Sequence, residues 1–394
     1  MNELYFKVKQ IIDDVNKNGD SALVKHTRIF DKISNFNKKD LLVKVKPVKI
    51  FDREFVSAIK YAIKNVRKFH LEENKRIKKT WVFNNKGMVL GQKIVPIESV
   101  GIYVPGGKYG YNYVSSLTMS VIPAQVAGVK NIVILTPPKN VSEYFLYTCN
   151  LLGIKKIYAV GGVQAIAAAA FGTECVPKVD LIIGPGNKWV TEAKRQLFGI
   201  VGIDLLAGPS EVVVVADKTI FLDEIVYELL AQVEHDSEAR SVLISLDKIT
   251  IKSVKLRIKN LNKKYLKQTK FILSKSIDDV INLINKISPE HLTFMLNKHV
   301  DKIIRGTKNA GAIFLGRNAS TVFGDYVAGP SHILPTNKTA NFSSGVSVQT
   351  FMKKISVVKF TSKFLESNIN SASKIAAVEG MVYHKNAVLS KVKN

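Results

Sequence analysis

Hydrophobic positions divide the chain into a helical N-terminal part and a longer part in which strands and helices alternate. Up to about Leu90, apolar side chains recur at intervals of three and four residues, as in the runs that start at Tyr5 and Phe55, and this spacing predicts amphipathic helices. From Ile94 onward, short β-branched runs alternate with helix-length segments, and helical patterns return in 249–286 and 371–392. The predicted strands are 100–104, 131–135, 156–160, 179–183, 212–215 and 241–246.

The alternation of strand-length and helix-length segments is typical of parallel βαβ units. Several of the apolar runs end in Gly or Pro, which favours loops at the carboxyl ends of the strands. Open α/β sheets bind their ligands at that edge. The pattern therefore predicts an α/β enzyme with parallel sheets.

Composition narrows the class of protein. The 394 residues are 46% hydrophobic and 23% charged, which suits a globular core and excludes a disordered or fibrous chain. Pro, Gln, Ser or Gly interrupt the longest uncharged stretches, so we expect no membrane span, and the N-terminus lacks the apolar core of a secretion signal. Two cysteines cannot form a disulfide framework. Together these features predict a cytoplasmic protein.

The net charge of +26 suggests a polyanionic partner such as nucleic acid. Lys outnumbers Arg by 49 to 9, however, and the lysines are spread over helix-like surfaces such as 60–79 and 252–270. Lys is poorer than Arg at bidentate recognition of bases and phosphates. We therefore interpret the charge as solvated surface and expect no specific nucleic-acid partner.

Three glycine-bearing turns, 104–107, 160–162 and 183–187, follow predicted strands, although the chain has no standard phosphate-loop or dinucleotide fingerprint. Glycine allows close backbone approach, and consecutive N–H groups beside a helix start can bind an anion. A plain turn explains any one of them. All three together predict a ligand-binding edge, because parallel strands end on the same side of a sheet.

Several polar side chains suit a metal. Gln232 and His235 are three residues apart on a predicted helix, so both can point to one ligand. Asp325 lies in a segment rich in Gly and Pro that we expect to be an ordered loop, and Glu379 and His384 lie at the end of the last long helix. Each alone is readily explained as an ordinary surface or core polar group. Jointly, imidazoles, a carboxylate and an amide oxygen suit a borderline metal such as Zn²⁺.

Glu290 and His291 put an acid beside a base. They follow Ser288 and Pro289, a context that predicts the start of a helix. A carboxylate next to an imidazole can keep the protonation of the pair near neutrality, the range in which a general base works. The pair is therefore a candidate for proton transfer.

Taken in order, these segments closely resemble the histidinol dehydrogenase family, zinc- and NAD-dependent enzymes of the last two steps of histidine biosynthesis. The resemblance covers nearly the whole chain, and matches of this length in this order are very specific. It rests on VGIYVPGG (100–107), GGVQAIAAAAFGTECVPKVDLIIGPGNKWVTEAKRQ (161–196), DLLAGPSEV (204–212), AQVEHD (231–236), SPEHL (288–292), GDYVAGPSHILPT (324–336) and EGMVYHKNAV (379–388).

The resemblance implies site residues on this chain. The implied zinc ligands are Gln232, His235, Asp325 and, donated by a second subunit, His384. The implied contacts to L-histidinol are Ser210, Gln232, His235, His291, Asp325, Glu379 and His384. NAD is expected to lie across the glycine turns and to contact Tyr103, Gln164 and Asn187.

The resemblance also implies a reaction, the oxidation of L-histidinol through L-histidinal to L-histidine with two NAD⁺ reduced in sequence. His291 is the expected base, because an alcohol becomes a good hydride donor as alkoxide character develops. Glu290 is expected to activate the water that hydrates the aldehyde.

The implied fold has two incomplete Rossmann-like domains with parallel sheets. One comprises 1–102 with 210–345 and carries most of the zinc and catalytic residues, and 103–209 forms an inserted NAD-binding domain. Residues 346–394 are expected to form a helical dimerisation tail that crosses a two-fold axis of a homodimer.

Two rival functions belong to other classes. A basic polyanion-binding protein that retains an enzyme-like scaffold would show damaged site positions, whereas every candidate position here is filled by the required residue. A zinc hydrolase would need a metal-bound water and no nicotinamide. Failure to form NADH from histidinol and NAD would favour the hydrolase.

Overall fold

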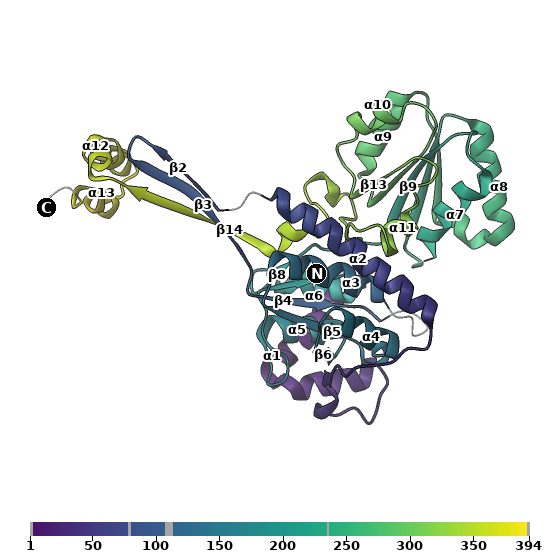
Figure 1. Cartoon of the computed structure of the whole chain (residues 1–394), viewed down its shortest axis with the longest axis horizontal. Coiled ribbons are helices and arrows are strands. Elements are labelled where there is room, and N and C mark those ends of the chain that lie inside the picture. The colour runs from purple at the N-terminus through teal and green to yellow at the C-terminus, as the bar shows by residue number, and fades with distance from the viewer. Residues whose placement is uncertain (1–2, 78–79, 107–112, 235, 392–394) are drawn as a thin grey trace. The chain divides into compact units, whose positions relative to one another are not determined.

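The computed structural model describes residues 3–77, 80–106, 113–234 and 236–391 (Figure 1). Contacts along the chain define two compact units. Unit 1 comprises 1–74 with 97–351, and unit 2 comprises 75–96 with 352–394. Among the helices in the described ranges, none is long and apolar enough to cross a membrane.

The first sheet of unit 1 has the strand order β1-β6-β5-β4-β7-β8, parallel except for β1, which pairs antiparallel with β6 at one edge. Helix α5 consists mostly of small buried residues, which pack in one hydrophobic core with the apolar face of α1. The strands are β1 (Leu42–Lys44), β4 (Ser99–Tyr103), β5 (Asn131–Thr136), β6 (Lys156–Ala159), β7 (Leu181–Ile183) and β8 (Gly202–Ile203). The helices are α1 (Glu3–Phe30), α2 (Arg53–Arg76), α3 (Val114–Ala127), α4 (Glu143–Leu151), α5 (Gly162–Phe171) and α6 (Lys188–Leu197).

The second sheet of unit 1 is wholly parallel, with the order β11-β10-β9-β12-β13. Its central strands are runs of buried β-branched and aromatic residues, as expected for a sheet covered on both faces. The strands are β9 (Glu211–Ala216), β10 (Arg240–Ser245), β11 (Thr269–Leu273), β12 (His291–Met295) and β13 (Ala312–Leu315). The helices are α7 (Leu222–Val233), α8 (Lys248–Asn262), α9 (Ile277–Ile287), α10 (Val300–Gly306) and α11 (Thr321–Tyr326).

The two sheets share one topology. In each, the first parallel strand along the chain lies in the middle, the second and third lie on one side of it, and the fourth and fifth on the other. The strand order of each sheet therefore reverses direction at a topological switch point. This point lies between β4 and β7 in the first sheet and between β9 and β12 in the second, and open α/β sheets bind ligands at its carboxyl edge. The prediction of an α/β fold with parallel sheets is confirmed.

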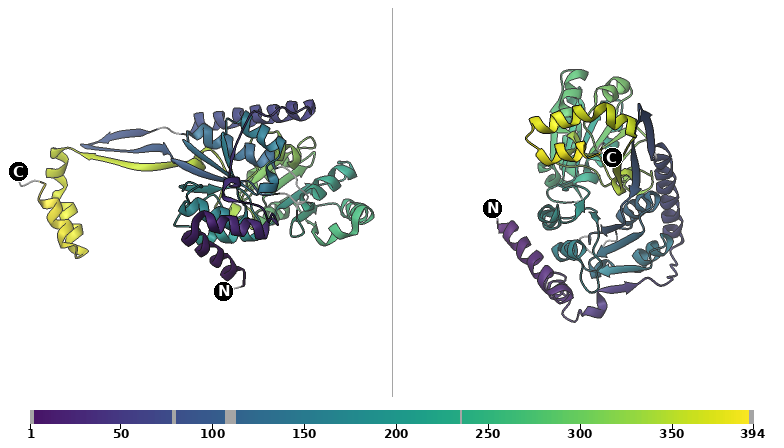
Figure 2. Two further views of the ribbon diagram at one scale, coloured as in Figure 1. Left: turned by 90° about the horizontal axis from the view of Figure 1, so that it is seen from below. Right: turned by 90° about the vertical axis from the view of Figure 1, so that its left-hand side faces the viewer.

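Unit 2 is a three-stranded antiparallel sheet with two helices. The strand order is β14-β3-β2, and α12 and α13 pack side by side (Figure 2). Among its described residues, Ala376 is the one hydrophobic side chain that is buried. The elements are β2 (Trp81–Asn85), β3 (Met88–Pro96), β14 (Met352–Phe360), α12 (Ser362–Val378) and α13 (Val382–Leu389).

The observed divisions differ from the predicted domain boundaries. Strands β1 and β4 belong to the first sheet, because β1 pairs with β6 and β4 lies between β5 and β7, whereas the sequence places both with the second sheet. Residues 346–351 belong to unit 1, and unit 2 takes 75–96 in addition to the C-terminal residues. The C-terminal part is also not purely helical, since it starts with β14.

Three predicted helical regions contain strands instead. The region before Leu90 ends in the hairpin of β2 and β3, joined by Lys86 and Gly87, which both have positive φ angles of 46° and 94°. The region 249–286 contains β11, and His291 begins β12 rather than a helix. The reason for the last error is local: Ser288 is the left-handed C-cap of α9, so Pro289 follows a helix instead of starting one.

Candidate active site

The three glycine turns lie at the carboxyl edge of the first sheet, after β4, β6 and β7. A Cβ atom placed on Gly106 or Gly161 would lie 3.2 or 2.5 Å from Pro137 Cγ, so both turns adjoin the same proline. Gly184 has a φ of 117°, and a Cβ atom there would lie 2.1 Å from the carbonyl oxygen of Tyr103. The predicted convergence of the turns is confirmed for these residues, while Gly107 lies outside the described residues.

The predicted cofactor contacts lie on or beside these turns, with Tyr103 at the end of β4, Gln164 in the first turn of α5 and Asn187 directly before α6. Tyr103 is buried, its hydroxyl accepts a 3.2 Å hydrogen bond from the N–H of Gly162, and burial raises its pKa to about 12. Gln164 is 1% exposed, and its buried Oε1 has no hydrogen-bond partner among the described residues. Asn187 caps α6, with Oδ1 accepting from the N–H groups of Trp189 and Val190 at 3.0 and 3.3 Å.

This edge has the features of an anion-binding site. The starts of α5 and α6 follow the second and third turns, and helix N-termini present N–H groups that favour phosphate. The partnerless amide oxygen of Gln164 adds a buried acceptor that a ligand donor could satisfy. The edge therefore suits an extended diphosphate ligand with hydrogen-bonding groups along its length.

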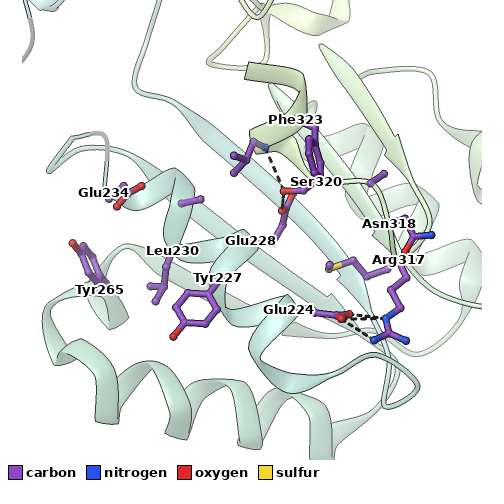
Figure 3. A pocket seen from close by; sticks show the side chains of 14 residues that line it. Glu224, Tyr227, Glu228, Leu230, Glu234, Tyr265, Arg317, Asn318, Ser320 and Phe323 are labelled. Carbon is purple, nitrogen blue, oxygen red and sulfur yellow. Dashed lines mark hydrogen bonds and ion pairs between the residues drawn. The ribbon is translucent and has the colours of Figure 1, made fainter. Parts of the chain in front are cut away.

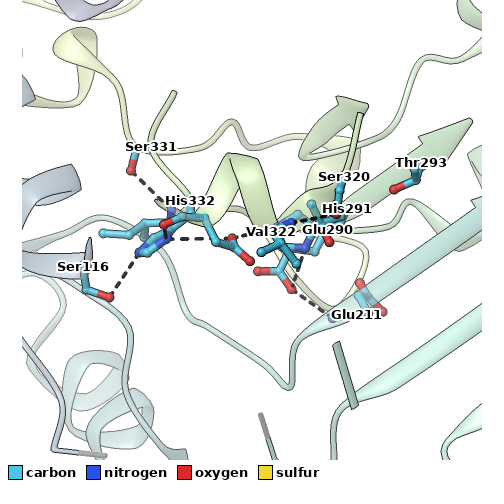
Figure 4. A network of polar contacts seen from close by, with 12 residues as sticks. Ser116, Glu211, Glu290, His291, Thr293, Ser320, Val322, Ser331 and His332 are labelled. Atoms are coloured by element: carbon cyan, nitrogen blue, oxygen red, sulfur yellow. Dashed lines mark hydrogen bonds and ion pairs between the residues drawn. The ribbon is translucent and has the colours of Figure 1, made fainter. Parts of the chain in front are cut away.

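The Glu290–His291 pair lies at the amino edge of the second sheet, where β12 begins (Figure 4). The side chains of Glu290 and His291 are 8% and 5% exposed, respectively. Glu290 Oε2 accepts a 2.9 Å hydrogen bond from the N–H of Glu211, the first residue of β9. The imidazole of His291 lies between two carboxylates, with Nδ1 3.7 Å from Glu290 Oε2 and Nε2 3.7 Å from Asp325 Oδ1.

Burial and mutual attraction shift both groups of the pair. Burial raises the pKa of Glu290 to about 7, against the opposing attraction of His291. Burial alone would lower the pKa of His291, but the negative charges of Glu290 and Asp325 outweigh it and raise this pKa to about 9. At neutral pH His291 is therefore mostly protonated while Glu290 is partly ionised. His291 Nδ1 has no hydrogen-bond partner among the described residues.

Asp325 reaches the pair from α11 and not from the loop that the sequence predicts. A Cβ atom on Gly324 would lie 2.6 Å from the ring of Phe314 on β13, so glycine allows α11 to lie close against the sheet. His332 holds the segment in place, because its Nδ1 donates to the Asp325 carbonyl oxygen at 3.0 Å and its Nε2 accepts from Ser116 Oγ at 3.1 Å (Figure 4).

Ser210 and Gln232 lie on neighbouring elements. Ser210 is half-buried and directly precedes β9, and the nearby Gly208 donates its N–H to Thr336 Oγ1 at 2.6 Å. Gln232 is 3% exposed in the last turn of α7. Helix α7 ends at Val233, and His235 lies outside the described residues.

Sequence reasoning missed Glu228, a buried acid that links three elements of this site. It accepts a hydrogen bond from Ser320 Oγ at 2.6 Å (Figure 3). It also accepts from Thr293 Oγ1 on β12 at 2.9 Å and from the N–H of Thr321 at 2.8 Å. These contacts tie α7 and β12 to the start of α11. A signal was present, because Glu228 interrupts the apolar face of α7 one turn before Gln232.

Comparison with known proteins decides the family. The family profile described as histidinol dehydrogenase matches residues 1–392. The chain belongs to the histidinol dehydrogenase family. Members of this family are NAD-dependent oxidoreductases that act on an alcohol and then on an aldehyde, and this chain is such an oxidoreductase.

Individual relatives within the histidinol dehydrogenase family agree. The chain is 39% identical to the histidinol dehydrogenase of Listeria innocua over 97% of this chain and 91% of that protein. It is 40% identical to that of Caldanaerobacter subterraneus over 98% and 92%, respectively. The crystal structure of histidinol dehydrogenase from Elizabethkingia anophelis matches with a TM-score of 0.87 at 34% identity, over all of this chain and 93% of that one.

Two further residues that the histidinol dehydrogenase resemblance implies, Glu379 and His384, lie in unit 2. Glu379 is the C-cap of α12, His384 lies in α13, and both are exposed. Exposed apolar side chains flank them, including Val378, Val382 and Tyr383 at 76%, 62% and 87%. Exposed apolar side chains that cluster in this way are typical of interaction surfaces.

The carboxyl edge of the second sheet is chemically unlike that of the first. A pocket of about 670 Å³ lies beside Met295 at the end of β12 and the residues that follow β13 (Figure 3). Among the described residues that line it, the one cation is Arg317, which is held by both oxygens of Glu224 at 2.8 to 3.1 Å. Glu228 and Glu234 add further negative charge, so the pocket is unsuited to a diphosphate.

Proposed function

We propose that this chain oxidises L-histidinol through L-histidinal to L-histidine, with two NAD⁺ reduced in sequence and with Glu290 and His291 as the proton-transfer groups. The observation that carries the proposal is the buried carboxylate–imidazole–carboxylate row of Glu290, His291 and Asp325 in a member of this family. Burial raises the pKa of Glu290 to about 7, so this carboxyl group exchanges a proton near neutral pH.

His291 accepts the hydroxyl proton of the alcohol while hydride passes from its carbon to NAD⁺, which yields the aldehyde and NADH. Glu290 then accepts a proton from the water whose oxygen attacks the aldehyde carbon, and protonated His291 returns its proton to the carbonyl oxygen, which forms the hydrate and leaves His291 free to accept again. His291 accepts a second hydroxyl proton as the hydrate gives its hydride to a second NAD⁺. A pKa of about 7 for Glu290 keeps a large fraction of its carboxylate ionised at neutral pH.

The proposed zinc ligands are Gln232, His235, Asp325 and His384 from a second subunit. The described residues alone contain no group of three or more His, Cys, Asp or Glu side chains able to hold a metal ion. Amide and carboxylate oxygens from Gln232 and Asp325, completed by two imidazoles, match the donors that zinc prefers. Bound zinc would anchor the substrate and, by offsetting the charge of Asp325, lower the pKa of His291 toward the range of a base.

The proposed NAD site is the carboxyl edge of the first sheet, as one of two incomplete Rossmann-like domains. Its support is the strand order, the three converging turns and the buried, partnerless Oε1 of Gln164. Tyr103 and Asn187 stand on the same turns, with a hydroxyl that stays protonated and a helix cap, respectively.

The proposed active form is a homodimer in which each tail completes the other subunit's site. The support is unit 2 itself, which buries almost no hydrophobic side chains among its described residues and exposes apolar ones around His384. Such a unit gains its stability from packing against another surface.

A histidinol-dependent NADH assay combined with metal analysis tests the reaction. We expect NADH to form with histidinol and NAD⁺, zinc to be bound, and chelation to remove both zinc and activity, which added Zn²⁺ restores. No NADH from histidinol, with zinc present, would contradict the oxidoreductase proposal and favour a hydrolase.

Mixing two inactive variants tests donation across the dimer. His291→Asn keeps an intact tail and His384→Ala keeps an intact core, so their mixed dimer has one complete site if His384 acts on the other subunit. After subunit exchange we expect about a quarter of the wild-type activity, since half of the dimers are mixed and each has one of two sites. No recovery, with mixed dimers demonstrated by mass, would place His384 in its own subunit's site.

A further inference from the structure

A buried ion pair lies directly behind the third glycine turn. The side chain of Lys194 on α6 is 2% exposed and that of Asp204, just after β8, is 1% exposed, with Nζ 2.7 Å from Oδ1. Lys194 Nζ also donates to the carbonyl oxygen of Gly184 at 2.5 Å, and Asp204 Oδ2 accepts from the N–H of Gly184 at 2.8 Å. The pair therefore holds both backbone polar groups of one residue.

The pair is poorly explained as a stabilising contact alone. Taking two charges out of water costs several kcal/mol, and apolar side chains of similar volume often give an equally stable core. An apolar pair, however, could not satisfy the two polar groups of Gly184, which are buried at the end of β7. This turn therefore needs a hydrogen-bond donor and an acceptor at these two positions.

The backbone conformation of Gly184 restricts the path of the turn. Its φ of 117° lies in the left-handed region, and its backbone presses against the carbonyl of Tyr103 on the neighbouring β4. Fixing the peptide groups on both sides of Gly184 sets the direction in which Pro185, Gly186 and Asn187 leave the sheet toward α6.

We propose that Lys194 and Asp204 are positioning residues that hold the Gly184–Asn187 turn in the conformation that binds NAD. The inference rests on the proposed function, because it places the cofactor on this turn. Neither side chain contacts the cofactor. They act through the backbone of Gly184, so their loss weakens NAD binding while the proton-transfer groups of the second sheet keep their geometry.

Steady-state kinetics on the full-length enzyme test this division. We expect Lys194→Met to raise the KM for NAD about tenfold or more, the effect of losing a charged hydrogen bond that shapes a site, with kcat and the KM for histidinol changed less than about threefold. Arg195→Met is the matched control, since Arg195 is the next residue on α6 and pairs with Glu192 at the surface. It should leave all three constants within about twofold.

A second variant separates positioning from stability. Lys194→Met leaves Asp204 as a lone buried charge, whereas Lys194→Met/Asp204→Asn removes that charge and keeps an acceptor for the Gly184 N–H. The double variant should regain thermal stability and retain the raised KM for NAD. Recovery of the KM along with stability, or a uniform fall in kcat and rise in both KM values, would overturn the proposal.

Gln164→Ala distinguishes failure of this inference from failure of the cofactor site. If Gln164→Ala raises the KM for NAD and Lys194→Met does not, only the positioning role is overturned. If neither variant changes it while the wild type forms NADH from histidinol, the cofactor does not lie on these turns and both proposals for this edge are overturned.

Discussion

The two sheets of unit 1 have the same strand order and carry their candidate functional groups at opposite edges. The first sheet presents three glycine turns and two helix starts at its carboxyl edge. The second presents Glu290, His291 and the first residue of β9 at its amino edge, while its carboxyl edge holds an acidic pocket with a neutralised Arg317. Strand order thus defines where a crevice can form, and local chemistry decides which edge is used.

The two edges also suit different physical tasks. The carboxyl edge of the first sheet offers backbone N–H groups and close approach, which suit a long anionic ligand. The amino edge of the second offers two carboxylates around an imidazole in a buried setting, which suits proton transfer. Substitutions at one edge should therefore change one kinetic constant and leave the other edge's constant nearly unchanged.

The largest effect is expected at the amino edge of the second sheet. His291→Asn should lower kcat by about 10²- to 10⁴-fold, because the hydroxyl proton loses its acceptor, with zinc content and the KM for NAD nearly unchanged. His299→Asn is the control, since His299 has a φ of 66° that Asn also tolerates and no role in the site. Loss of zinc in step with activity would instead make His291 a metal ligand.

Glu228 is expected to support the same edge through packing. Glu228→Ala should lower the free energy of unfolding by about 2 to 4 kcal/mol, because Thr293, Ser320 and Thr321 lose their shared acceptor. Urea unfolding measures this. Glu224→Ala, on the same helix with an exposed partner in Arg317, should cost less than about 1 kcal/mol, and equal losses for the two variants would refute the linking role.

At the carboxyl edge of the first sheet, Gln164→Ala should raise the KM for NAD several-fold to about tenfold, since a ligand donor loses its buried acceptor. The kcat should change little. Gln10→Ala, an exposed position on α1, provides the control. A fall in kcat at constant KM would show that Gln164 acts on the chemistry and would blur the contrast between the two edges.

The smallest effect concerns stability and pH. The pKa of His291 is raised from 6.5 to about 9, so its protonated form stabilises the fold fully below pH 6.5, and this contribution is lost as the pH rises through 9. The unfolding temperature of the chelated protein should fall over this window by more in the wild type than in His291→Asn. Parallel curves for the two proteins would mean that His291 titrates alike in the folded and unfolded states.

Much of the first sheet could be predicted from the sequence, because its signals are local. Buried strands such as β4 and β5 are continuous apolar runs, and glycine follows their neighbours at the turns. The hairpin of β2 and β3 also has a local signal, because Lys86 and Gly87 form a two-residue turn between strand-like runs. The helical pattern of α2, which directly precedes it, hides this signal.

The rest depends on contacts between distant residues. Glu228 forms hydrogen bonds with residues 65 to 93 positions away along the chain. The role of Lys194 depends on its contacts with Asp204 and Gly184. Neither spacing corresponds to a helix or strand period. The position of Glu290 and His291 at the amino edge of the second sheet also could not be predicted from the sequence. It depends on where α9 ends, at Ile287, and on the pairing of His291 with Val212.

A crystal structure of the His291→Asn enzyme with NAD⁺ and histidinol tests the division of the two edges most directly. The account predicts the diphosphate of NAD⁺ along the turns at Gly161 and Gly184, and the hydroxyl of histidinol beside position 291 at the start of β12. Density for the dinucleotide in the pocket beside Met295 and Arg317, the equivalent edge of the second sheet, would contradict it.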